Sequence, residues 1–600
     1  MGAIFLFFFP ILSLLSQTYI VRGPYLQVAT QNSIIIRWRT NTATSSRISY
    51  GTNVNNLNQV SQSSSNTTEH QIKLTGLQPD TKYYYAVGNI DNLLATNANL
   101  YFYTLPPNQT KRAYSFWILG DCGTGNNDQR SVRDAFIEYN NNKPIDGMIL
   151  LGDNAYDFGT DGQYQDALFN NMYENIISNT VIWPTPGNHD YYSGADAATQ
   201  TGAYYQIFSM PTDAELGGTP SHTKAYYSFN IGNIHFISLD SYDSSRDSTS
   251  AMGLWLKQDL QQNQQEWTIA FWHHAPYTKG SHNSDNPFPY LDFELPQMRE
   301  QLVPILERYG VDLILCGHSH AYERSFLLNG HYGNSSTLNT SHKLDEGKGD
   351  FINDCPYQKK TKTSKANKGT IYAVVGVSGK KGGTSSGWPH PVMVSASNAY
   401  LGSMVLTVNE NRLDATFLTS NQTIFDQFTI IKNAGGKTTV PFCQGEDLTL
   451  HASFPDQNYI WQPGNVHAES LTIQPYFNSL YYGGDAMGCI KDTFQLIAIQ
   501  PDSPNDTCGQ FSSLSSQEDI SDLVIFPNPS HYNQTIQLTL PNQWELPSEA
   551  YIYDIYGRTI TQFTINTPNS TIPILLNPGV YLIEIRNLHQ HISHQIIINF

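Results

Sequence analysis

Five short polar motifs in the middle of the chain each follow a hydrophobic run. In chain order they are Gly120-Asp121-Cys122-Gly123, Gly152-Asp153-Asn154-Ala155-Tyr156, Gly187-Asn188-His189-Asp190, His273-His274-Ala275-Pro276-Tyr277 and Gly317-His318-Ser319-His320. A single Asp at the end of a strand is most often a helix cap or a turn residue. Five such motifs together supply carboxylate, amide and imidazole donors, which are the groups that bind metal ions. Their combination predicts a site for two metals.

The hydrophobic runs before these motifs predict the elements that position them. Phe116-Trp117-Ile118-Leu119 and Leu313-Ile314-Leu315 are typical of buried strands. Since the carboxyl ends of such strands meet at one edge of a sheet, we expect the motifs to converge there. If their segment is extended, His318 and His320 lie on the same side of it and can straddle a metal pair.

The order of the donors has a known parallel. Asp, then Asp-x-x-Tyr, then Asn-His, then His, then His-x-His resembles the purple acid phosphatases, a branch of the binuclear metallophosphoesterases, over residues 20–432. The ligands that this resemblance implies are Asp121, Tyr156 and His320 for the first metal, Asn188, His274 and His318 for the second, and Asp153 as the bridge. His274 is preferred to His273 because the family's ligand precedes x-Pro, which Ala275-Pro276 fits.

The Tyr156 side chain indicates which metal ions to expect. A phenolate is a hard anionic donor, and with Asp121 and Asp153 it suits Fe(III). Two imidazoles and a neutral amide suit a divalent ion such as Zn, Fe or Mn. The net charge of Fe(III), a divalent ion and these three anionic donors is about +2. This local charge attracts phosphate despite an acidic surface.

The resemblance also implies a reaction. A hydroxide held by the metals would attack the phosphorus of a phosphomonoester in line. His189 and His282 would flank the substrate, and one of them would protonate the leaving alcohol. His282 lies eight residues after His274, near the position of a substrate-binding histidine of the family, and an exposed loop histidine is the competing interpretation. Asp190 either orients His189 or caps a turn.

Charge and cysteine content narrow the class of protein. The formal net charge of -18 and the lack of a Lys/Arg-rich block argue against nucleic-acid binding. Charged residues make up 14% and aromatic residues 12%, which is typical of exported β-rich proteins. The cysteine spacing is a separate indication. None of the six cysteines forms a C-x-x-C pair, so no zinc ribbon or redox motif is predicted. Cys443 and Cys489 are candidates for one disulfide, and the other four have no evident pairing.

The predicted fold class is a multidomain chain whose centre is an α/β metallophosphoesterase of sandwiched sheets with flanking helices, between β sandwiches at both ends. Residues 1–17 are expected to be a signal peptide, with a buried strand or helix as the alternative. Residues 18–110 resemble a fibronectin type III domain, because Leu77-Gln78-Pro79-Asp80-Thr81-Lys82-Tyr83 matches its tyrosine corner. Residues 111–432 form the catalytic domain, with helices expected over 129–140 and 292–309.

The remainder of the chain reads as β structure. Residues 437–501 suggest an immunoglobulin-like module and residues 502–520 a linker. Residues 521–600 contain Phe526-Pro527-Asn528-Pro529, Tyr553-Asp554-Ile555-Tyr556-Gly557-Arg558 and Pro578-Gly579-Val580-Tyr581. Their order resembles the C-terminal sorting domain of the type IX secretion system of Bacteroidota, and a plain small β sandwich is the alternative. The resemblance implies export, with the secretion machinery as partner and a product that is secreted or attached to the cell surface.

The leading functional hypothesis is therefore a secreted acid phosphatase that acts on small phosphoesters. One alternative is a phosphodiesterase or nucleotide-cleaving enzyme with the same core, which the turnover of 4-nitrophenyl phosphate and of its bis ester would distinguish. The other is a surface-binding protein with a vestigial phosphatase domain, which a lack of bound metal would favour.

Overall fold

The computed structural model describes residues 17–286, 288, 292–360, 368–499, 508, 523–526, 528, 530–531, 535–541, 544–554, 558–573, 576–577, 579–587 and 591–599. The expected signal peptide lies outside these residues except for residue 17, and of the expected linker only Cys508 is described. The chain forms two compact units, of which the first ends at Ala434 and the second begins at Gly435. None of the described helices is both long and apolar enough to cross a membrane.

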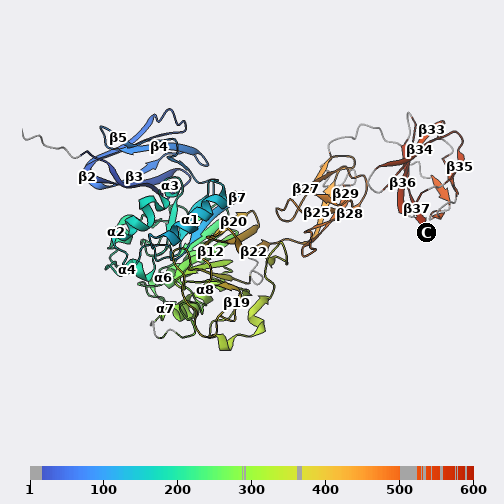
Figure 1. Ribbon diagram of the computed structural model, residues 1–600. Coiled ribbons are helices and arrows are strands. Elements are labelled where there is room, and N and C mark those ends of the chain that lie inside the picture. Colours follow the sequence, from blue (N-terminus) through green and yellow to red (C-terminus); the bar gives the residue numbers. More distant parts are fainter. Residues whose placement is uncertain are drawn as a thin grey trace, which may run out of the picture. The chain divides into compact units, whose positions relative to one another are not determined.

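The first unit begins with a β domain (Figure 1). Its sheet contains β1 (Ile20–Gln27), β2 (Ser33–Gly51), β3 (Gln59–Thr75), β4 (Lys82–Gly88), β5 (Leu93–Ala95) and β6 (Tyr101–Tyr103). The long strand β2 pairs with β1 through its first half and with β4 through its second half. The backbone N–H of Gln78 donates to the Tyr83 hydroxyl at 3.0 Å, which is the contact that a tyrosine corner makes. An N-terminal β domain was predicted, and this prediction is confirmed.

Two sheets of seven strands form the centre of the first unit. One contains, in spatial order, β10 (Tyr227–Ile231), β11 (Ile234–Ser238), β12 (Trp267–His274), β13 (Leu313–Gly317), β18 (Ile371–Val375), β14 (Tyr322–Ser325) and β19 (Met393–Ser397). The other contains β17 (Tyr357–Lys359), β22 (Ile424–Lys432), β21 (Arg412–Thr419), β20 (Gly402–Asn409), β7 (Ala113–Leu119), β8 (Gly147–Leu150) and β9 (Ile182–Pro184). Phe116 of β7 packs edge-on against Phe236 of β11, with ring centroids 4.9 Å apart, so the two sheets face each other.

Helices connect the strands of these sheets. They are α1 (Asn127–Asn140), α2 (Asp161–Tyr164), η1 (Gln165–Tyr173), α3 (Glu174–Ile177), α4 (Asn188–Tyr191), α5 (Ala203–Ile207), α6 (Ala251–Gln262), α7 (Glu294–Gln297), η2 (Met298–Leu302) and α8 (Val303–Arg308). The Asn126 side chain caps α1 by accepting from the backbone of Gln129. Trp117 of β7 stacks on Phe136 of α1 at 4.1 Å, which fixes this helix against its sheet. The predicted helices over 129–140 and 292–309 are therefore present, the second as the series α7, η2 and α8.

Short elements complete the first unit: β15 (Leu327–Leu328), η3 (Ser335–Thr337), η4 (Thr340–His342) and β16 (Lys343–Asp345). The second unit starts with β23 (Gly436–Phe442), β24 (Leu448–His451), β25 (Ile460–Gln462), β26 (Val466–His467), β27 (Ser470–Ile473), β28 (Ser479–Gly484) and β29 (Lys491–Ala498). These strands form a five-stranded and a two-stranded sheet. Trp461 is buried between Tyr459 and Phe494 in this module.

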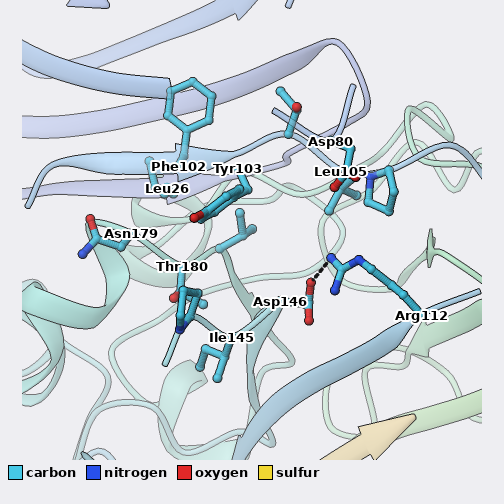
Figure 2. A pocket seen from close by; sticks show the side chains of 14 residues that line it. Leu26, Asp80, Phe102, Tyr103, Leu105, Arg112, Ile145, Asp146, Asn179 and Thr180 are labelled. Atoms are coloured by element: carbon cyan, nitrogen blue, oxygen red, sulfur yellow. Dashed lines mark hydrogen bonds and ion pairs between the residues drawn. The ribbon is translucent and has the colours of Figure 1, made fainter. Parts of the chain in front are cut away.

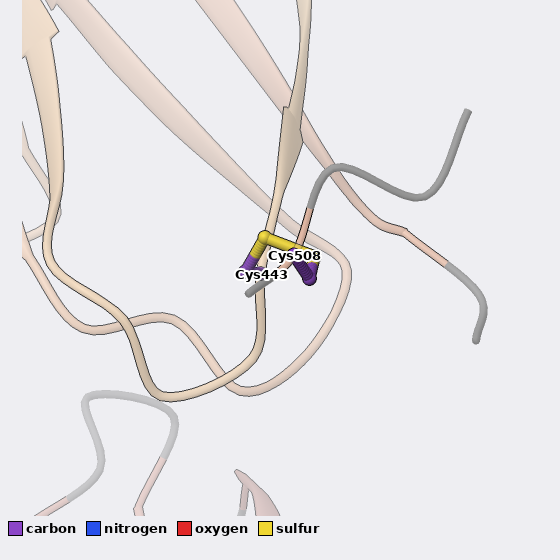
Figure 3. The surroundings of a disulfide bond; sticks show 2 residues. All are labelled: Cys443 and Cys508. Carbon is purple, nitrogen blue, oxygen red and sulfur yellow. A yellow bond between two sulfur atoms is a disulfide. The ribbon is translucent and has the colours of Figure 1, made fainter. Parts of the chain in front are cut away.

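The disulfide expected between Cys443 and Cys489 is wrong, because Cys443 is bonded to Cys508 (Figure 3). The reason is the direction of two strands. β23 and β29 run parallel, with Phe442 beside Ala498, so Cys443 lies at the end of β29, where the chain continues toward Cys508. Cys489 precedes β29 and lies at the opposite end of the strand pair. Cys122 and Cys316 are buried free thiols.

The last part of the second unit is a β domain of two sheets. One contains β30 (Val524–Phe526), β32 (Thr535–Thr539) and β35 (Asn569–Pro573), and the other contains β31 (Ser530–His531), β37 (His591–Asn599), β36 (Gly579–Arg586), β33 (Ser548–Tyr553) and β34 (Thr559–Ile565). Ile536, Ile552 and Ile583, from both sheets, share one buried apolar core. The burial of this core stabilises the pairing of the two sheets.

Candidate metal centre

The metal-binding motifs lie where strands of the two facing sheets end. Asp121 follows β7, Asp153 follows β8 and His318 follows β13. All three residues have backbone φ angles between 53° and 66°, in the left-handed region that residues other than glycine seldom adopt. Strained backbone of this kind clusters at functional sites, where it aims side chains that a regular strand would direct elsewhere.

A first cluster of donors consists of Asp121, Tyr156 and His320. The Tyr156 hydroxyl lies 3.0 Å from Asp121 Oδ1 and 3.3 Å from His320 Nε2. His320 Nε2 is also 3.3 Å from Asp121 Oδ1. Donors that bind one ion at about 2.1 Å and at right angles lie about 3 Å apart, so the spacing of these atoms fits a common metal.

A second cluster consists of Asn188, His273 and His318. His273 Nε2 lies 3.1 Å from Asn188 Oδ1 and 3.3 Å from His318 Nδ1. Asp153 Oδ1 is 3.3 Å from the same His273 nitrogen, and the Asp153 carboxylate also raises the pKa of Tyr156 in the first cluster. Asp153 therefore borders both clusters, at the position expected of a bridging ligand.

The structure places His273, and not the predicted His274, in the second cluster. His274 is buried and its Nδ1 lies 2.8 Å from the Ser241 hydroxyl. Neighbouring side chains of a strand point in opposite directions, so only one of the two histidines at the end of β12 faces Asp153. The x-Pro pattern that favoured His274 contains no information about which way a side chain at the end of the strand points.

The proton positions in the second cluster favour a cation. His273 Nδ1 lies 2.8 Å from the carbonyl oxygen of Leu151 and donates to it, so Nε2 of the neutral ring bears a lone pair. The Asn188 amide donates to the Tyr192 hydroxyl at 2.8 Å, which turns its Oδ1 toward that lone pair. Once a metal ion displaces the Nε2 proton, lone pairs of His273, Asn188 and Asp153 face each other, and this donor set fits such an ion.

The electrostatics of the site lead to the same conclusion. Burial lowers the pKa of His273, but the Asp153 and Asp121 carboxylates outweigh burial and raise that pKa to about 9. Burial, Asp121 and Asp153 raise the pKa of Tyr156 far above its ordinary value, so a phenolate there requires a bound cation. The clusters attract positive charge.

Asp190 holds the loops of the two clusters together. Its carboxylate accepts hydrogen bonds from the backbone of Gly187 at 2.8 Å, from the Asn154 amide at 2.9 Å and from the Tyr164 hydroxyl at 2.5 Å. His189 is oriented instead by the carbonyl oxygen of Asp157, which lies 2.6 Å from its Nδ1. Of the two roles considered for Asp190, the structure supports turn capping.

His189 and His282 both lie beside the clusters. The His189 ring packs against the Tyr156 ring with centroids 4.5 Å apart, and its Nε2 is 3.9 Å from Asp153 Oδ2. The His282 ring is 3.9 Å from the His318 ring, and its side chain is only 17% exposed. This burial argues against the exposed-loop interpretation of His282.

Sequence reasoning missed Asp292. Its Oδ2 lies 2.6 Å from His282 Nδ1 and its Oδ1 lies 3.6 Å from His318 Nε2. Burial raises the pKa of Asp292, but the neighbouring His282 and His318 imidazoles reverse the shift and hold the pKa below its ordinary value. No motif in the sequence marks Asp292, because ten positions and a turn separate it from His282.

A pocket of about 250 Å³ lies elsewhere in the first unit, between the N-terminal β domain and the central sheets (Figure 2). Leu26 and Tyr103 line it from one side, and Asp146 and Arg112, paired at 2.6 Å, line it from the other. None of its lining residues belongs to either donor cluster, so this pocket is separate from the metal centre.

Comparison with protein families agrees with the geometry. Residues 114–322, which include every predicted ligand from Asp121 to His320, match the calcineurin-like phosphoesterase family. The central domain is thus similar to the calcineurin-like phosphoesterases. Residues 21–104 before it match the purple acid phosphatase N-terminal domain, and residues 524–599 match the secretion system C-terminal sorting domain.

Several proteins of similar sequence are acid phosphatases by name. Purple acid phosphatase 15 of Arabidopsis thaliana is 28% identical over 319 residues, which cover 46% of this chain and 56% of that protein. Acid phosphatase type 7 of Danio rerio is 26% identical over 326 residues, or 49% of this chain and 68% of that protein. The chain thus spans only part of the length of these relatives. A purple acid phosphatase from yellow lupin (Lupinus luteus) seeds shares the fold with a TM-score of 0.53 at 18% identity, over 68% of this chain and 75% of that one.

Proposed function

We propose that the phosphoesterase domain is an exported acid phosphatase that hydrolyses phosphomonoesters at two adjacent metal ions. The observation that supports this proposal best is the position of Asp153 between two clusters of buried donors. Phosphatases with two metals use such an arrangement to hold both the attacking and the leaving oxygen.

Each cluster would hold one ion. Asp121, Tyr156 and His320 would bind the first, and their two hard anionic donors suit Fe(III). Asn188, His273 and His318 would bind the second, and their neutral donors suit a divalent ion such as Zn, Fe or Mn. Bound there, the ions would lower the pKa of water to supply the nucleophile and would neutralise charge on the phosphoryl oxygens.

The histidines beside the clusters would move the protons. Asp292 keeps a proton on His282 Nδ1, and the Asp157 carbonyl keeps one on His189 Nδ1. Each ring therefore takes up or releases a proton at Nε2. When the ester bond breaks, a protonated His282 or His189 would give its Nε2 proton to the leaving alcohol oxygen.

The sorting domain at 524–599 supports delivery of this activity outside the cell. Its partner would be the type IX secretion machinery, and the substrates would be small phosphoesters in the surroundings. We propose no nucleic-acid partner, since the formal net charge is -18.

The test uses purified full-length protein after reconstitution with iron and zinc. Turnover of 4-nitrophenyl phosphate and of bis(4-nitrophenyl) phosphate is measured from acid to neutral pH, and bound metal is measured by elemental analysis. We expect two metal ions per chain and preferential hydrolysis of the monoester in acid. Preferential hydrolysis of the bis ester would identify a phosphodiesterase, and a protein that retains no metal would be a binding protein with a vestigial domain.

A further inference from the structure

A short glycine-rich segment, residues 378–383, crosses the rim of the metal centre. A Cβ atom on Gly379 would lie 2.6 Å from the backbone oxygen of Asp121, so the chain passes directly against this ligand. The backbone N–H of Gly382 donates to the carbonyl oxygen of His320 at 2.9 Å. Both ends of the segment are thus fixed against residues of the first cluster, and Lys380 and Lys381 lie between them.

The side chains of Lys380 and Lys381 have different contacts. Lys380 Nζ lies 3.8 Å from the centroid of the Tyr156 ring, whose hydroxyl belongs to the first cluster. Lys381 Nζ instead donates to the backbone oxygen of Ala399 at 3.0 Å. Among the described residues, no carboxylate lies within the 4.0 Å ion-pair distance of the Lys380 ammonium group.

The positive charge of Lys380 lies beside the proposed metal centre. The proposed centre, with both metals bound, is already positively charged, so a further ammonium group beside it is repelled unless an anion lies between them. The cation–π contact with Tyr156 holds the side chain in place but neutralises nothing. The fixed segment therefore presents Lys380 to an anion that arrives with the substrate.

We propose that Lys380 binds a second phosphoryl group of the substrate, so that it raises kcat/KM for phosphoanhydrides such as pyrophosphate and nucleoside diphosphates without affecting simple monoesters. This inference rests on the proposed phosphatase function. The second group must adjoin the phosphorus under attack, because the ammonium lies directly over a ring that belongs to the metal centre. A lysine ammonium binds phosphate as a point charge from several directions, which suits a group of variable orientation.

The reaction balances without a further reactant. The oxygen of water forms a bond to the terminal phosphorus, and the bond from that phosphorus to the bridging oxygen breaks. The bridging oxygen leaves with the electron pair as part of the second phosphate, which takes up the proton that water loses. Lys380 would stabilise the negative charge that grows on this leaving phosphate.

The experiment compares three variants, Lys380→Met, Lys380→Arg and Lys381→Met, in metal-loaded full-length protein. The value of kcat/KM is measured for pyrophosphate and for 4-nitrophenyl phosphate. Loss of one charged contact predicts a fall of about tenfold or more for pyrophosphate in Lys380→Met, and of less than about threefold for 4-nitrophenyl phosphate. Lys380→Arg should recover most of the pyrophosphate activity, and Lys381→Met should match the wild type.

A binding measurement removes the dependence on turnover. Calorimetric titration with methylenebisphosphonate, which is not hydrolysed, should show a weaker Kd in Lys380→Met by the same factor, while the Kd for orthophosphate changes little. Equal losses for both substrates, or equal effects of the Lys380 and Lys381 variants, would overturn the role of Lys380. A wild type that hydrolyses neither substrate would overturn the phosphatase proposal itself and this inference with it.

Discussion

Asp292 accepts a hydrogen bond from His282 Nδ1 at 2.6 Å, while its other carboxylate oxygen lies 3.6 Å from Nε2 of His318. One carboxylate thus contacts both a donor of the second cluster and the histidine stacked on that donor. Such outer carboxylates fix the tautomer and the direction of an imidazole.

This contact predicts the behaviour of Asp292→Asn. The amide can donate a hydrogen bond to Nδ1 and so allow the wrong tautomer of His282, and we expect kcat to fall by roughly 10²-fold. His282→Ala should lose as much, and the double variant should lose little more, because the two residues act as a unit. Additive losses would contradict this pairing. Metal content, measured by elemental analysis, should stay near two ions in each variant.

The two histidines at the end of β12 provide a matched pair. His273→Ala removes a nitrogen of the second cluster, so we expect about one metal ion per chain and a large loss of turnover. His274→Ala removes an equally buried imidazole whose partner is Ser241, and the folded protein should retain both ions. Circular dichroism shows whether each variant is folded. Loss of metal from the His274 variant alone would return the ligand role to His274.

Asp153→Ala should release both ions, because Asp153 borders both clusters. Asp121→Ala should release mainly the ion of the first cluster. Asp213→Ala, which changes an exposed carboxylate outside the centre, is the control. Two ions retained in the Asp153 variant would show that this residue does not bridge.

Tyr156→Phe tests the proposed Fe(III) site. A phenolate on Fe(III) gives a visible charge-transfer band, so the wild type should be coloured and the variant should lose the band at matched iron content. The ring remains to pack against His189, and far-ultraviolet circular dichroism should be unchanged. An identical band in both proteins would show that Tyr156 does not bind the metal.

Removal of residues 521–600 tests the sorting domain. We expect the truncated chain to keep its phosphatase activity in cell extracts and to be missing from the surface and the medium, since the site lies entirely in the first unit. Immunoblots of cell fractions measure this distribution. Normal export of the truncated chain would show that these residues are a β domain with another role.

The sequence predicted the parts of the site that depend on local order along the chain. Asp121 and Asp153 directly follow hydrophobic runs, and such runs become buried strands that end at a shared edge. The choice between His273 and His274 depends on which way the end of β12 faces, and this is decided by the neighbouring strands. The pairing of His282 with Asp292 is a contact through space between two turns, which no periodicity records.

The disulfide partner of Cys443 depends in the same way on a distant element. Spacing alone made Cys489 a reasonable partner, because both residues flank the buried Trp461. The parallel pairing of β23 with β29 places them at opposite ends of the strand pair. Whether two strands of a small β module pair in parallel depends on how the whole chain is arranged in the sheet. The residue pattern along one strand does not contain this information.

The bond between Cys443 and Cys508 also determines which breaks in the polypeptide separate its parts. It closes a ring across a sequence separation of 65, so a protease that cuts one peptide bond inside the ring leaves both fragments joined through sulfur. A cut between Cys508 and β30 lies outside the ring, so it separates the terminal β domain from the part of the chain before it. In an oxidising exterior, a single cut inside this ring therefore does not release the enzyme from its sorting domain, whereas a cut between Cys508 and β30 does.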